Sequence, residues 1–127
     1  MSHQISTVRK FYSLFYNERR LAEGAALLSE DFVNHHPGAH GIGREGMIDD
    51  FSRLGPPPSF RLAPIRVAED GDFVWVLAHA TGIGPVDGMA FDLWRFEGDL
   101  IVEHWDAFRR LEADEAPAAL FAGLGRR

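Results

Sequence analysis

The change of hydrophobic period at a glycine-proline stretch is the feature that most limits the fold of this chain. Before Gly55-Pro56-Pro57-Pro58, apolar residues recur at helical spacing, and after it they recur at about every second residue. Consecutive prolines end a helix because they lack the N–H donor and clash with the preceding turn. Helices followed by a series of strands are typical of α+β folds and not of parallel α/β folds. We therefore predict an α+β chain with its helices first and a mainly antiparallel sheet after them.

Three helices are expected before the prolines, over residues 5–17, 21–28 and 43–54. The first carries one apolar stripe, made of Ile5, Val8, Phe11, Tyr12 and Phe15. The buried side of the second comprises Leu21, Ala25 and Leu28, and that of the third comprises Met47, Ile48, Phe51 and Leu54. A short extended segment at 32–35 and a loop at 37–43 lie between the second and third helices.

Four strands are expected after the prolines, at 59–68, 72–81, 88–97 and 100–110, because apolar and polar residues alternate there. The segment 116–123, rich in alanine and glycine, is expected to form a short last helix. A length of 127 residues is enough for one core and too short for a second domain. We therefore expect one domain over 1–127, with its core at about 5–110 and a C-terminal tail at 111–127.

Charge and composition exclude several classes of function. The net charge is −6 and the basic residues are scattered, so no nucleic-acid partner is expected. No segment approaches the roughly 20 apolar residues that a membrane span needs. The chain has no cysteine, which removes disulfides, thiolate nucleophiles and cysteine-ligated zinc. The first ten residues lack the pattern of a signal peptide, so the cytoplasm is the expected location.

Chemistry-bearing side chains concentrate in the last predicted strand. Alternation puts His104 and Asp106 on one face with apolar neighbours, and Ile101 and Trp105 on the other. Desolvation on an apolar face disfavours a charged carboxyl, which suits it to exchange a proton near neutral pH. The alternative interpretation is that these polar residues lie at the rim of the sheet and are simply solvated.

The sequence leaves the face of Asp92 open. If Gly98-Asp99 is a two-residue hairpin loop, the pairing sends Asp92 to the face of Glu103 and Trp105. If the turn has three residues, with Gly98 in the left-handed bulge position, Asp92 and Trp94 share the face of Asp106. Both turns are compatible with the residues present.

Several blocks of the chain resemble one family in order and spacing. The segments are Glu103-His104-Trp105-Asp106, Phe91-Asp92-Leu93-Trp94-Arg95-Phe96, Phe32-Val33-Asn34-His35-His36-Pro37, Gly43-Arg44-Glu45-Gly46-Met47 and Asp70-Gly71-Asp72-Phe73-Val74. They resemble the SnoaL-like polyketide cyclase family, within the nuclear transport factor two-like superfamily. The similarity covers about residues 5–110, and its most specific block is Glu103-His104-Trp105-Asp106.

The resemblance implies a cone-shaped fold, with three helices packed on a curved sheet of four to six strands. It further implies aldol-type chemistry, with Asp106 as the acid/base and His104 beside it. Asp92, Trp94 and His35 would line the substrate pocket, which supports the turn that puts Asp92 on the pocket face.

Four departures from the family pattern bear on the substrate. Asn34 stands where the family has glutamine, and His36 where it has asparagine. Leu77 stands where a histidine is often found, while His79, two residues on, projects to the same side. Arg109 replaces a glutamine. His36 and His79 are therefore further candidates for substrate binding.

Two functions follow as alternatives. The first is an enzyme without a cofactor, a cyclase, isomerase or lyase, in which Asp106 takes a proton next to the carbonyl of a small organic molecule. His104 or His35 would then hold the enolate oxygen. The second is a domain of the same fold that binds a small ligand or a protein without catalysis. No metal is expected, since His35, His36 and His40 would have to converge from an irregular loop.

A homodimer is expected to form through the sheet. Trp105 and Ile101 lie on the predicted outer face, where they would otherwise be exposed to solvent.

Overall fold

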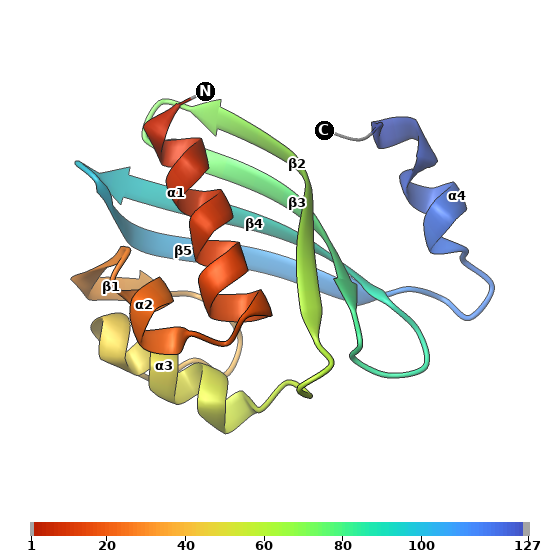
Figure 1. The fold of residues 1–127 in the computed structure, drawn as a ribbon, viewed down its shortest axis with the longest axis horizontal. Coiled ribbons are helices and arrows are strands. Elements are labelled where there is room, and N and C mark those ends of the chain that lie inside the picture. The colour runs from red at the N-terminus through yellow and green to blue at the C-terminus, as the bar shows by residue number, and fades with distance from the viewer. Residues whose placement is uncertain (1, 126–127) are drawn as a thin grey trace.

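The computed structural model describes residues 2–125 and contains one five-stranded sheet with the strand order β1-β5-β4-β3-β2. The strands are β1 (Leu28–Asn34), β2 (Arg61–Asp70), β3 (Phe73–Thr81), β4 (Gly88–Glu97) and β5 (Leu100–Arg110). The edge strand β1 runs parallel to β5, and all other neighbours are antiparallel. The expected α+β fold with a mainly antiparallel sheet is confirmed (Figure 1).

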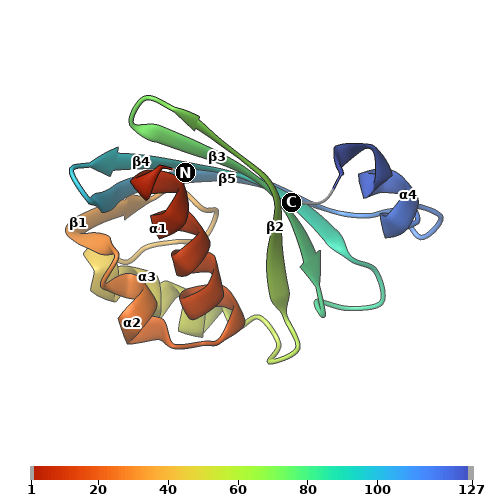
Figure 2. The ribbon, with the colours of Figure 1, turned by 45° about the horizontal axis from the view of Figure 1, so that its top comes forward.

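Three helical segments lie on one side of the sheet, which curves over them to form a cone (Figure 2). They are α1 (His3–Phe11), which continues as a π-helical turn over Tyr12–Asn17, α2 (Leu21–Ala25) and α3 (Gly43–Leu54). In the tail, α4 (Pro117–Phe121) and a 3₁₀ turn (Ala122–Leu124) form the expected last helix, apart from the other helices. No helix within residues 2–125 is long and apolar enough to cross a membrane.

An aromatic core joins the helices to the concave face of the sheet. Its largest fully buried side chains are Trp94, Tyr12, Phe11, Phe15, Phe32 and Phe96. Phe11 stacks on Phe15 with ring centroids 5.0 Å apart and contacts Trp94 at 5.2 Å. Each such side chain contributes about 1.5–3 kcal/mol on burial, so this cluster fixes α1 across the strands that carry the candidate site.

The second helix is shorter than predicted, and the first strand begins earlier. Leu28, expected at the end of a helix over 21–28, instead opens β1 opposite Ile101. The Ile101 N–H donates to the Leu27 carbonyl, and the Arg44 guanidinium donates to the Leu28 carbonyl. These partners outside the helix satisfy the backbone where helical bonds would have formed. A leucine suits either element, so its pattern alone did not separate them.

The hairpin between β4 and β5 decides which side chains face the helices. Its loop is the two-residue Gly98-Asp99, with Gly98 at a φ of +59°. Next to this loop, Phe96 of β4 pairs with Ile101 of β5, but the following pair is Arg95 with Glu103. Val102 is therefore an extra, unpaired residue in β5. This β-bulge reverses the parity of the pairing. The two-residue loop agrees with the first of the two predicted turns. The position of Asp92 on the pocket face agrees with the second, because the bulge lies in the strand and not in the turn.

The same bulge makes the prediction for Ile101 wrong. Ile101 was expected on the outer face, but it is fully buried in the core, because the extra residue turns it inward. Trp105 does lie on the outer face, in cross-strand register with Leu93, which in turn pairs with Trp75. Trp75 and Phe91 are 47% and 49% exposed, which leaves an apolar patch on this face.

Candidate active site

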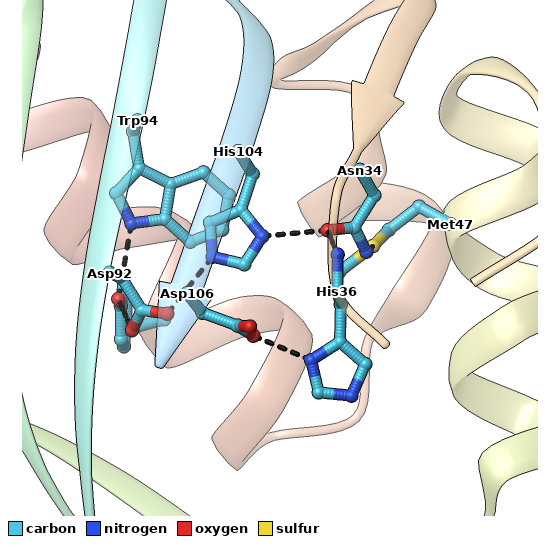
Figure 3. A network of polar contacts seen from close by, with 8 residues as sticks. Asn34, His36, Met47, Asp92, Trp94, His104 and Asp106 are labelled. Carbon is cyan, nitrogen blue, oxygen red and sulfur yellow. Dashed lines mark hydrogen bonds and ion pairs between the residues drawn. The ribbon is translucent and has the colours of Figure 1, made fainter. Parts of the chain in front are cut away.

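Adjacent strands bring four polar side chains to the concave face of the sheet. Asp92 on β4 is the register partner of Asp106 on β5, and Trp94 is the partner of His104. Asn34 at the end of β1 pairs with His104 on its other side. Figure 3 shows these side chains converging between the sheet and α3. The Val102 bulge is therefore what assembles the site.

His104 and Asp92 form a buried pair. The His104 Nε2 atom lies 2.9 Å from Asp92 Oδ1, and the two side chains are only 2% and 5% exposed. The imidazole also stacks on the Trp94 indole, with ring centroids 3.9 Å apart. The second Asp92 oxygen accepts a hydrogen bond from the Tyr12 hydroxyl, which itself accepts one from Trp94 Nε1 at 3.1 Å.

The remaining hydrogen bonds fix the tautomer of His104. Asn34 Oδ1 accepts from the His36 backbone N–H at 3.1 Å, so this atom is an oxygen. His104 Nδ1 lies 2.8 Å from the same atom and must donate to it. Both ring nitrogens of His104 are thus engaged, one by Asn34 and one by Asp92. His104 shares the face of Asp106, as predicted from the strand alternation, but Asp106 is not among its hydrogen-bond partners, so His104 does not orient that carboxylate.

Asp106 is instead paired with His36. The His36 Nδ1 atom lies 2.5 Å from Asp106 Oδ2, and the side chains are 38% and 12% exposed. This hydrogen bond raises the pKa of His36, which favours an imidazolium that donates to the carboxylate. The other oxygen of Asp106 has no hydrogen-bond partner among residues 2–125. Asp106 therefore keeps one oxygen available.

A cavity of about 290 Å³ lies beside these groups. Its polar lining comprises Asp92, His104, Asp106, His36, Asn34, Asp50 and Tyr16. Its apolar lining comprises Met47, Phe51, Leu54, Pro56, Phe60, Leu62, Ala90 and Phe108. An apolar wall with a few convergent polar groups is typical of a small-molecule site.

The π-helical turn presents two tyrosines to this region. Tyr12 and Tyr16 are both buried, and Ser13 between them is exposed. Burial, with the nearby Asp92 carboxylate, raises the pKa of both phenols well above the usual value, so both stay protonated. The Tyr12 hydroxyl is occupied by Asp92, whereas that of Tyr16 has no hydrogen-bond partner within residues 2–125. Tyr16 is therefore an available donor.

Asp50 on α3 holds the loop that carries His36. Its carboxylate accepts from the backbone N–H groups of His40 and Gly41 and forms an ion pair with Arg53 at 2.9 Å. Burial would raise the pKa of Asp50, but these hydrogen bonds outweigh it and lower the pKa. The charge of Asp50 is thus neutralised within its own element.

Three residues predicted to bind substrate do not line the cavity. His35 lies on the outer face, where it contacts Glu103 at 2.7 Å and stacks on Trp105. His79 also faces outward, against Asp87 at 2.8 Å and the Phe121 ring. Trp94 lies on the predicted face of the sheet, but His104 and the aromatic residues of the first helix cover it completely. The predicted residues that do line the cavity are Asp92, His104, Asp106 and His36.

No site role is predicted from the sequence for Tyr12, Tyr16 or Asp50. Tyr12 appeared there only as a member of an apolar stripe. The signal available was a pair of hydroxyl-bearing aromatics four residues apart on a core-facing helix, since a buried tyrosine usually needs a polar partner. Asp50 had no sequence signal, because its partners are backbone N–H groups of a loop.

One set of side chains within residues 2–125 has the spacing of a metal site. Asp92, His104 and Asp106 each offer a ligand atom within 4.8 Å of the others. These atoms are largely committed, since both His104 nitrogens and both Asp92 oxygens already have partners. The donor set therefore does not fit a metal ion without breaking the buried pair, and we assign none.

Solved structures with a similar fold include NTF2-like proteins. An NTF2-like protein of unknown function from Burkholderia pseudomallei is 27% identical, with a TM-score of 0.70 over 86% of this chain and 92% of that one. A candidate ketosteroid isomerase from Kribbella flavida is 25% identical, with a TM-score of 0.71 over 91% and 82%. IdmH, a candidate polyketide cyclase from Streptomyces antibioticus, is 22% identical, with a TM-score of 0.67 over 83% and 91%.

The family can be stated more narrowly. The SnoaL-like domain matches residues 8–104, which is most of the chain and includes β1 to β4 with the start of β5. The protein therefore belongs to the SnoaL-like family. No functionally curated protein sequence matches it.

Proposed function

We propose that this protein is an enzyme without a bound cofactor that moves a proton next to the carbonyl group of a small organic molecule. The reaction class is that of an aldol-type cyclase, an isomerase or a lyase. Asp106 is the general base, and it returns the proton as the general acid. The observation that carries the proposal is the state of Asp106, which has one oxygen held by His36 and the other unpartnered beside an apolar cavity.

His36 and Tyr16 have separate parts in this scheme. The imidazolium of His36 donates a hydrogen bond to one oxygen of Asp106 and holds the carboxyl group with its other oxygen beside the cavity. Tyr16 donates its hydroxyl proton in a hydrogen bond to the carbonyl oxygen, where negative charge develops. His104 cannot take that part as it stands, because both of its nitrogens are engaged. The buried His104–Asp92 pair instead holds the wall of the cavity.

The reaction can be written with these groups alone. Asp106 takes the proton from the carbon next to the carbonyl. The C–H electron pair becomes the C=C bond of an enolate, and the π pair of the carbonyl moves to its oxygen. The enolate then attacks a second carbonyl, takes the proton back at another carbon or expels a leaving group. A ligand that covers the apolar wall would displace water from these groups, which would strengthen each of these electrostatic interactions.

Proton exchange tests the proposal before a natural substrate is known. Aromatic ketones and β-keto esters are incubated with the protein in D₂O, and loss of the α-proton signal is followed by NMR. We expect exchange above the buffer rate for at least one compound, and loss of that exchange in Asp106→Asn. Absence of catalysed exchange across the panel, with ligands bound in the cavity, would favour the non-catalytic alternative.

A further inference from the structure

The second ring nitrogen of His36 is free. Its Nδ1 atom lies 2.5 Å from Asp106 Oδ2, but Nε2 has no hydrogen-bond partner within residues 2–125. Figure 3 shows Nε2 on the side of the ring away from Asp106. The side chain is partly exposed and forms part of the cavity lining. A ligand in the cavity can therefore contact His36 without displacing Asp106 from it.

Hydrogen bonds to the backbone hold His36 in place. Its own N–H donates to Asn34 Oδ1 at 3.1 Å, at the end of β1. Further along the same loop, Asp50 of α3 accepts from the backbone N–H groups of residues 40–41. The imidazole thus has a fixed position between the sheet and α3, which proton transfer to a bound ligand requires.

The surroundings of His36 favour its protonated form. The charged and titratable groups around it come from β4, β5, α3 and the π-helical turn, and they are Asp92, His104, Asp106, Asp50, Arg53 and Tyr16. The hydrogen bond to Asp106 raises the pKa of His36, and the charges of Asp106, Asp92 and Asp50 add to this effect. Because Nδ1 of this imidazolium donates to Asp106, its remaining donor is Nε2–H.

The His36–Asp106 pair therefore presents a proton acceptor and a proton donor at its two ends. The acceptor is the unpartnered oxygen of Asp106, and the donor is Nε2–H of His36. A cyclase or a lyase needs both, because an oxygen away from the deprotonated carbon takes up a proton. That oxygen belongs to the second carbonyl in an aldol reaction and to the leaving group in an elimination.

Neither of the other polar side chains nearest to the pair can supply this proton as they stand. Burial raises the pKa of Tyr16 well above its usual value, so its hydroxyl can donate a hydrogen bond but retains its proton near neutral pH. Both ring nitrogens of His104 are already engaged, by Asn34 and Asp92.

We propose that His36 is a second catalytic residue of this site, the general acid that protonates the oxygen of the second carbonyl or of the leaving group through Nε2. This inference rests on the proposed function, since it names the proton donor for two of its reaction classes. Membership of the family does not supply this donor, because the family pattern has asparagine where this chain has His36.

The step conserves protons and charge. In an elimination, the C–H proton goes to the free oxygen of Asp106, and the C–H electron pair becomes a C=C bond. The C–O bond to the leaving group breaks, and its oxygen keeps the electron pair and takes the Nε2 proton. The pair changes from imidazolium and carboxylate to imidazole and carboxylic acid, so its net charge stays zero beside the apolar wall. Asp106 then releases a proton to water, and Nε2 takes one up.

Elimination from three ketones tests this role. The compounds are 3-(4-nitrophenoxy)propiophenone, 3-phenoxypropiophenone and 3-methoxypropiophenone, whose leaving groups need a proton increasingly in that order. All three give phenyl vinyl ketone, which is quantified by liquid chromatography, and the chain has no cysteine for this product to alkylate. The variants of the full chain are His36→Asn and the matched control His35→Asn. His35 is the adjacent histidine, but it contacts Glu103 on the outer face.

His36→Asn should lower kcat/KM by about a hundredfold for the phenoxy and methoxy compounds and by less than about threefold for the nitrophenoxy compound. The reason is that nitrophenolate leaves without a proton, whereas the other two leaving groups need one. With the phenoxy compound, the wild-type rate should fall as the pH rises through the raised pKa of His36, and the variant should lack this decrease. His35→Asn should change none of these rates.

An equal loss for all three compounds would overturn the inference, because His36 would then only position Asp106. No loss for any compound would also overturn it. If His36→Asn does not fold, the wild type alone decides: its rate should fall less than about tenfold from the nitrophenoxy to the phenoxy compound, and a steeper fall excludes a general acid.

The proposed function can fail separately. Exchange of the α-proton of propiophenone requires Asp106 but no proton on a leaving group. Exchange without catalysed elimination of the phenoxy compound overturns the role of His36 and leaves the proposed function intact. Absence of both exchange and elimination contradicts the proposed function, and the role of His36 fails with it.

Discussion

The buried His104–Asp92 pair gives a sharp prediction about stability, because the chain contains a matched pair at its surface. His79 and Asp87 lie 2.8 Å apart, close to the 2.9 Å of the buried pair, but their side chains are 23% and 29% exposed. Asp92→Ala leaves His104 Nε2 and the Tyr12 hydroxyl without an acceptor. Two orphaned buried groups at about 1–3 kcal/mol each give a loss of about 2–6 kcal/mol.

That range agrees with the roughly 3–5 kcal/mol observed when one partner of a buried ion pair is removed. Asp87→Ala removes the corresponding carboxylate at the surface and should cost about 0–1 kcal/mol. The free energy of unfolding is measured in urea, with tryptophan fluorescence as the signal. Asp92→Asn keeps the volume and one acceptor, so it should lose less than Asp92→Ala and remains measurable if the alanine variant does not fold. A loss below about 1 kcal/mol for Asp92→Ala, or equal losses at the two sites, would refute the reasoning.

Four further predictions follow from the same contacts. Tyr16→Phe should lower the rate of catalysed α-proton exchange by roughly a hundredfold with an unchanged unfolding midpoint, as loss of an oxyanion donor does, and a change of less than about threefold would exclude that role. Dialysis against EDTA should change neither the exchange rate nor the unfolding midpoint, and restoration of a lost rate by added divalent metal would contradict the assignment of no metal. The pKa of His36 is raised in the folded state, so its stabilising effect is fully present below the unfolded pKa and is lost as the pH rises through the raised value. The difference in unfolding free energy between wild type and His36→Asn should therefore shrink from mildly acidic to alkaline pH. A difference that does not depend on pH would contradict this prediction. We also expect a homodimer through the outer face of the sheet, so sedimentation at micromolar concentration should show a dimer that Phe91→Asp dissociates, and a monomeric wild type would rule it out.

The hydrophobic periodicity was sufficient to predict the helices and strands that bury one face along their whole length. The strands at 88–97 and 100–110 and the helix at 43–54 have the predicted bounds, because each pattern is long and buried on one face. The placement of His104 and Asp106 on the same face also follows from alternation alone, since no irregularity falls between them.

The errors arise where one residue changes the geometry. The Val102 bulge has no signature in composition, yet it turns Ile101 inward and brings Asp92 beside Asp106. Of two consecutive histidines, the end of β1 directs His36 to the cavity and His35 to Trp105. The predicted extended segment, 32–35, ends one residue later than β1, so the sequence pattern did not separate the two histidines. Such differences depend on tertiary pairing, which a local pattern does not encode.

The central claim is that Asp106 transfers the proton, and the turnover of Asp106→Asn on the first compound found to exchange tests it most directly. Asparagine keeps the shape of the side chain and can still contact His36, but it cannot accept the proton. The rate should fall by on the order of a hundredfold to ten-thousandfold, with little change in the unfolding midpoint. Near-full turnover by a folded Asp106→Asn protein would contradict it, and Asp106 would then be a structural partner of His36.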